Sequence, residues 1–131
     1  MTSKARLLVA TILLLCSACA TTKMPTTEEI SRFDYGPYPQ NYETLIKAHF
    51  KEILFDPYSA VYESIGVPSK AWWKDSAFLG GRLYTGYIVI VRINAKNRYG
   101  GYVGIKTHGF IINNDRIVRV LQDFELQNYR P

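Results

Sequence analysis

The stretch YIVIV, residues 87–91, decides the fold that the sequence predicts. It lies within residues 82–95, the strongest strand candidate of the chain, and it is apolar at positions that an extended strand turns to opposite faces. A strand that is apolar on both faces needs cover on both sides. We therefore expect residues 82–95 to form a central strand of a sheet, with a helix packed over one face.

Residues 41–55 show the periodicity of a helix that provides this cover. Apolar side chains and one histidine recur there at positions i, i+3, i+4, i+7, i+8, i+11 and i+12, which lie on one face of an α-helix. Asn41 can cap the start, and Pro57 ends the helix because proline disfavours helical geometry at the residue before it. The segment predicts an amphipathic helix whose apolar face packs on the sheet.

Four shorter segments have the composition of further strands: residues 58–65, 69–73, 109–113 and 116–122. The last two form a hairpin around Asn114 and Asp115, which tolerate the left-handed turn conformation. The predicted fold is therefore α+β, with one N-terminal amphipathic helix packed on an antiparallel sheet of about four to five strands.

The first eighteen residues have the layout of a secretion signal. Lys4 and Arg6 give a positive start, residues 7–15 form an apolar run, and small residues precede Cys19. The apolar run is too short to cross a bilayer as a helix. This layout predicts export of the chain.

The ending LCSAC, residues 15–19, resembles the lipobox of bacterial lipoproteins. The resemblance implies cleavage before Cys19, a diacylglycerol on its sulfur and an acylated amine. Ala20, in place of Asp, implies export to the outer membrane in a cell that has one. The alternative is an ordinary secretory signal cut near Ala18 or Ala20, which leaves a free protein.

The chain then divides into a lipoprotein signal peptide, the lipidated Cys19 with a tether, and a single domain, at residues 1–18, 19–40 and 41–131. The tether is rich in Thr, Pro, Glu and Gly and shows no sustained period, which is typical of a linker. Phe33, Tyr35 and Tyr38 can instead dock on the domain as an N-terminal strap.

Composition limits the class of partner. The chain has 16 Lys and Arg against 11 Asp and Glu, a formal net charge of +5, and Lys4 and Arg6 leave with the signal. This mild excess, together with the export signal, predicts no nucleic-acid partner. The mature chain keeps Cys19 alone, so no intramolecular disulfide is expected, and the spacing of His and Cys predicts no metal site.

Two histidines, His49 and His108, are the candidates for acid–base chemistry. His49 lies on the apolar stripe of the predicted helix, which favours a packing role. The alternative is an envelope hydrolase that uses one of the two with a carboxylate, but the chain has no Gly-x-Ser-x-Gly nucleophile motif. The sequence therefore predicts a protein that is not an enzyme and that uses no cofactor and no metal.

Residues 96–104, KNRYGGYVG, are the most distinctive segment. One interpretation is a recognition loop, in which Tyr99 and Tyr102 supply flat contact area and Lys96 and Arg98 supply cationic donors. The other is a hairpin whose glycines permit a tight turn and whose tyrosines cover the edge of the core. The segment lacks the Lys-Ser/Thr ending and the following helix of a phosphate-binding loop.

Trp72 and Trp73 are neighbours in a predicted strand. Neighbouring side chains of a strand point to opposite faces, so one is expected in the core and the other on the outer face. The outer one can lie against a partner, lipid or the tether.

Two segments carry a further resemblance: LFDPYSAVY, residues 54–62, and NAKNRYGGYVG, residues 94–104. Their patterns, DP-x-SA after a helix and NAKN-x-YGGY-x-G after a long strand, are similar to those of a group of small bacterial lipoproteins with no established activity. The resemblance implies a shared domain and no mechanism.

The sequence thus predicts a lipid-anchored cell-envelope protein, on the periplasmic side of the outer membrane in a Gram-negative cell. Its expected role is that of a non-catalytic binding or scaffolding module, with the membrane as one partner and an envelope protein or the cell wall as the other. The alternatives are a surface-modifying or exclusion lipoprotein of a phage or plasmid, and the envelope hydrolase.

Overall fold

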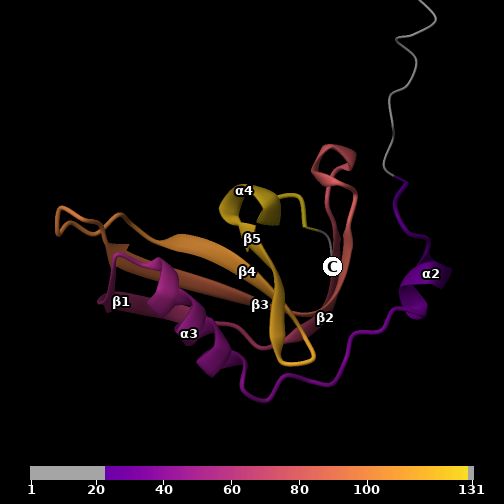
Figure 1. Ribbon diagram of the computed structural model, residues 1–131, viewed down its shortest axis with the longest axis horizontal. Coiled ribbons are helices and arrows are strands. Elements are labelled where there is room, and N and C mark those ends of the chain that lie inside the picture. The colour runs from indigo at the N-terminus through magenta and orange to yellow at the C-terminus, as the bar shows by residue number, and fades with distance from the viewer. Residues whose placement is uncertain (1–22, 130–131) are drawn as a thin grey trace, which may run out of the picture.

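A computed structural model of the chain describes residues 23–129 (Figure 1). Cys19 and the expected signal peptide lie outside the described residues. The elements in chain order are α2 (Thr27–Ser31), α3 (Tyr42–Ile53), β1 (Asp56–Ile65), β2 (Ser69–Lys74), the 3-10 helix η2 (Ala77–Leu79), β3 (Leu83–Lys96), β4 (Lys106–Asn113), β5 (Arg116–Gln122) and α4 (Asp123–Leu126). Within these residues, no helix combines the length and the apolar character that crossing a bilayer requires.

Strand β3 is the centre of a five-stranded antiparallel sheet, as the sequence predicts. It pairs with β4 along one side, and β4 pairs with β5. On its other side, β2 pairs with the half of β3 from Leu83 to Ile88, and β1 pairs with the half from Val91 to Lys96. Two short strands thus share one side of a single long one.

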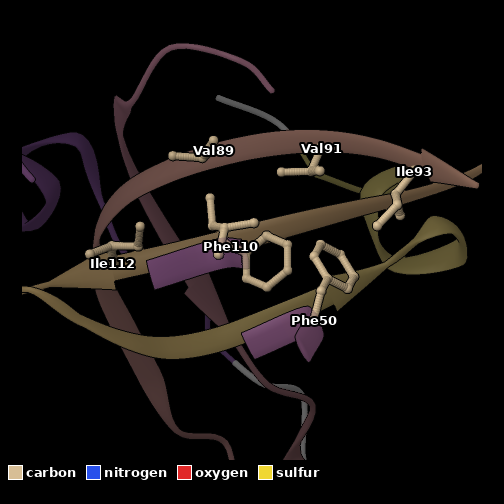
Figure 2. Close-up of a cluster of buried hydrophobic side chains, with 7 residues drawn as sticks. Phe50, Val89, Val91, Ile93, Phe110 and Ile112 are labelled. Atoms are coloured by element: carbon tan, nitrogen blue, oxygen red, sulfur yellow. The ribbon is translucent and has the colours of Figure 1, made fainter. Parts of the chain in front are cut away.

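The alternating side chains of β3 supply two separate apolar clusters. On one face, Val89, Val91 and Ile93 pack with Phe110 and Ile112 of β4 beneath Phe50 of α3 (Figure 2). On the other face, Ile88 packs with buried side chains of β2, β4 and β5. Because β3 is apolar on both faces, each face needs an apolar cluster that covers it.

The predicted fold class, α+β with one N-terminal helix, is wrong. The structure is mainly an antiparallel sheet of five strands, and its helices are short, with five residues in α2, twelve in α3 and four in α4. The helix that packs on the sheet, Tyr42–Ile53, is not N-terminal, since α2 and a further segment precede it. A clear helical period shows where a helix forms but not how much of the fold it represents.

The segment before α3 lies against the sheet. The ring centroids of Phe33 and Trp72 are 6.4 Å apart, and those of Tyr38 and Tyr87 are 5.5 Å apart. The Thr85 hydroxyl also donates a hydrogen bond of 2.6 Å to the main-chain carbonyl of Asp34. These contacts support a docked strap over residues 33–38, in place of a free tether there.

Candidate functional site

The loop that follows β3 has a backbone fixed by its own side chains. The Asn97 side-chain oxygen accepts hydrogen bonds from the N–H groups of Tyr99 and Gly101, at 2.9 and 3.2 Å. The Asn97 N–H donates to the Gly101 carbonyl at 2.9 Å. Gly100, between Tyr99 and Gly101, has a φ of 80°, a value that residues with a side chain rarely adopt. Asn97 therefore holds the first turn of the loop in one conformation.

A second asparagine fixes the return of the loop. The Gly104 N–H donates a hydrogen bond of 3.1 Å to the Asn94 side-chain oxygen, and the Val103 N–H donates to the Ala95 carbonyl at 3.3 Å. Gly104 has a φ of 90°. The return of the loop is thus bound to Asn94 and Ala95, near the end of β3.

Ser59 of β1 joins the loop to the neighbouring strand. Its hydroxyl oxygen accepts a hydrogen bond of 3.0 Å from the Lys96 N–H, and its carbonyl accepts one of 3.3 Å from the Tyr102 hydroxyl. The same hydroxyl donates to the Asp56 carbonyl at 2.8 Å. Residues 54–62 and 94–104, the two distinctive segments of the sequence, are therefore joined to each other in the structure.

The four loop residues singled out in the sequence divide into two pairs. The Lys96 amine lies 5.4 Å from the centroid of the Tyr102 ring, so these two side chains contact each other and Tyr102 is tied to β1. Arg98 and Tyr99 are exposed, with 88% of the Tyr99 surface accessible. Tyr102 is 51% exposed but held by these contacts, whereas Arg98 and Tyr99 have the exposure of recognition residues.

Further apolar side chains are exposed at the same end of the sheet. Phe55 and Tyr58, at the start of β1, are 71% and 89% exposed, and Asp56 between them pairs with Lys96. Large apolar side chains exposed at one end of a sheet are candidates for an interaction surface. We call Phe55, Tyr58, Arg98 and Tyr99 the loop surface.

The tryptophan pair belongs to β2 and lies beside the opposite half of β3, where Trp72 pairs with Thr85 and Trp73 with Tyr84. Trp72 packs on Phe33, so the strap is the neighbour that covers it. Trp73 donates a hydrogen bond of 2.9 Å from its indole N–H to the Asp75 carboxylate. Both are partly buried. They line a cleft of about 540 Å³ together with Met24, Pro25, Ile30, Lys74, Asn128 and Tyr129.

The two histidines lie between α3 and the sheet, His49 on α3 and His108 on β4. The His108 ring centroid is 5.3 Å from that of Phe50, and the His49 ring centroid is 5.4 Å from that of Phe110. Burial lowers the pKa of His108, the nearby charge of His49 also lowers it, and the Asp123 carboxylate opposes the shift. Within residues 23–129, no cluster of three or more His, Cys, Asp or Glu side chains is arranged to hold a metal ion.

The lowered pKa of His108 predicts a stability that depends on pH. The folded state binds the imidazole proton less tightly than the unfolded state does. The neutral His108 side chain therefore contributes its full share of the free energy of unfolding above the ordinary pKa of 6.5, and this share is lost as the pH falls through the lowered pKa. We expect the urea midpoint to decrease over this range and the decrease to be smaller in His108→Gln. Equal pH profiles for the two proteins would contradict this assignment.

Comparisons of the chain with protein-family models, with curated proteins and with solved structures find no match.

Proposed function

We propose that this chain is a lipid-anchored envelope protein whose small domain binds another envelope protein through the loop surface. In this proposal Cys19 carries the lipid, the domain faces the periplasm and the protein is not an enzyme. The observation that carries the proposal is the position of the loop surface relative to the start of the described chain.

These two parts lie at opposite ends of β3 (Figure 1). The Lys23 carbonyl accepts a hydrogen bond of 2.6 Å from the Lys74 amine, and Lys74 pairs with Leu83 at the beginning of β3. The loop follows Lys96 at the end of the same strand. Fourteen residues of extended chain span roughly 40 Å. An anchor four residues before Lys23 would thus leave the loop surface free to meet a partner.

The composition of the loop surface suits protein recognition. Tyrosine and arginine are enriched among the residues that contribute most to protein–protein binding. The bonds of Asn97 fix the Tyr99 backbone before any partner arrives, so less conformational entropy is lost on binding. Phe55 and Tyr58 add exposed apolar area at the same end of the sheet.

The test is crosslinking of the full-length protein in native cells, followed by mass spectrometry of what is captured. The variant is Arg98→Ala with Tyr99→Ala, because neither side chain supports the loop backbone. Loss of one strong contact residue weakens binding by at least about tenfold, so capture of the partner should fall by a comparable factor.

The matched control replaces an exposed cation and an exposed aromatic elsewhere, Lys51→Ala with Phe124→Ala. Capture equal to wild type in the control and reduced capture in the loop variant would support the proposal. Equal capture in both variants would exclude the loop surface. Capture of peptidoglycan alone would assign the surface to the cell wall.

A further inference from the structure

The tip of the β2–β3 hairpin presents apolar side chains to solvent at the end of the molecule opposite the loop surface. Residues 76–81, SAFLGG, contain no charged side chain. Within η2, Phe78 is 97% exposed and Leu79 is 60% exposed. The N–H groups of Leu79 and Gly81 both donate to the Ser76 carbonyl at 2.9 Å. The tip is therefore a folded turn that holds Phe78 and Leu79 outward.

Cations surround the base of this tip. Lys74 and Arg82 flank it in sequence, and the Lys74 amine donates a hydrogen bond to the main-chain carbonyl of Lys23. The single carboxylate between Lys74 and Arg82, that of Asp75, is turned inward, 7% exposed and paired with Arg119 at 3.1 Å. The result is an apolar tip with a cationic base.

One carboxylate of α2 offsets part of this charge. The pKa of Glu29 is lowered by its hydrogen bonds with Thr26 and, to a smaller extent, by the charges of Lys23 and Lys74. Three cations against one carboxylate still leave the base of the tip positive.

Chain length places this tip close to the proposed anchor. The four residues from Cys19 to Lys23 span at most about 14 Å when fully extended. Beyond Lys74, the Asp75 N–H donates to the Arg82 carbonyl at 2.9 Å, so Phe78 lies about 10 Å further along the hairpin. A lipid on Cys19 would therefore bring the tip within reach of the same bilayer, whereas Phe55 and Tyr58 lie at the far end of β3.

We propose that Phe78 and Leu79 insert into the interfacial layer of the membrane that holds the anchor, with Lys74 and Arg82 at the level of anionic headgroups. This inference rests on the lipid anchor of the proposed function. An apolar tip with adjacent cations is the combination that binds the surface of an anionic bilayer. The tip is a second point of attachment, and it fixes the domain with the loop surface turned away from the membrane.

The test measures the depth of a probe on the full-length lipidated protein. Because the lipid blocks the one cysteine of the expected mature chain, an environment-sensitive fluorophore attaches only to a cysteine introduced as Leu79→Cys. The control carries Tyr99→Cys, at the loop surface. Both proteins are placed in vesicles of phosphatidylethanolamine and phosphatidylglycerol, and incorporation of a clickable fatty acid verifies the anchor.

We expect the fluorophore at position 79 to emit at shorter wavelength and to be quenched several-fold less by aqueous iodide than the one at position 99. Adding Phe78→Ser should restore quenching at position 79, whereas the matched change Phe55→Ser should not. Both side chains are exposed, so neither change is expected to unfold the domain.

Equal quenching at both positions on vesicle-bound, fatty-acid-labelled protein would overturn the insertion and leave the anchor intact. A chain without fatty acid would overturn the anchor and the insertion together. Protection of position 79 in the absence of vesicles would show that protein, not lipid, covers the tip.

Discussion

Replacing Phe50 with alanine should lower the free energy of unfolding by about 3–5 kcal/mol. Phe50 is 1% exposed and lies between α3 and the sheet (Figure 2). Its ring centroid is 5.3 Å from those of His108 and Phe110 and 5.9 Å from that of Tyr62. Truncation would remove these contacts and leave a cavity that the surrounding strands cannot close.

Phe55→Ala is the matched control, since it removes the same side chain five residues later in the chain. Phe55 is 71% exposed, so its loss should change stability by no more than about 0.5 kcal/mol. Urea unfolding followed by circular dichroism measures both variants. If Phe50→Ala lowered the free energy of unfolding no more than Phe55→Ala does, the packing of α3 on the sheet would not depend on Phe50.

Local periodicity identified the segments of regular structure. The helix expected at residues 41–55 is Tyr42–Ile53, and the strongest strand candidate is the central strand β3. Asn114 and Asp115 have φ values of 50° and 55°, as the expected hairpin requires. Each of these features is decided by residues that are close in sequence.

The fold class was missed because a local period shows where a helix forms but not its share of the fold, and the order of the strands depends on pairing between distant residues. Nothing in the sequence of β1 or β2 shows that the two share one side of β3. Helices α2 and α4, of five and four residues, are too short to show a period.

Only part of the candidate site could be predicted, because it too depends on contacts between distant residues. The sequence singled out the loop, but Lys96 and Tyr102 differ from Arg98 and Tyr99 because of Ser59, which lies 37 residues before Lys96. The hairpin tip gave no signal, because Phe78 and Leu79 resemble core residues until their exposure is known.

A cluster of charged side chains that sequence reasoning did not find joins β2, β5 and α4. The Arg119 guanidinium lies 3.1 Å from the Asp75 carboxylate and 2.8 Å from that of Glu125. Asp75 also accepts the hydrogen bond from the Trp73 indole. Asp75 and Arg119 are 44 residues apart, so no local pattern predicts their pairing.

Replacing Arg119 with leucine should lower the free energy of unfolding by about 2–3 kcal/mol. Breaking a fully buried ion pair costs about 3–5 kcal/mol because it leaves an uncompensated charge, and the 24% exposure of the Arg119 side chain reduces that cost. Arg92→Leu is the matched control, since the pair of Arg92 with Glu63 has side chains that are 49% and 46% exposed.

Arg92→Leu should lower the free energy of unfolding by no more than about 1 kcal/mol, because water screens an exposed ion pair. Urea unfolding at neutral pH separates the two cases. If Arg119→Leu and Arg92→Leu were equally stable, the cluster would not hold β2 to β5, and the apolar packing of β2 would be the main contact between them. A larger loss for Arg119→Leu would show that charge pairing within the domain stabilises the base of the hairpin.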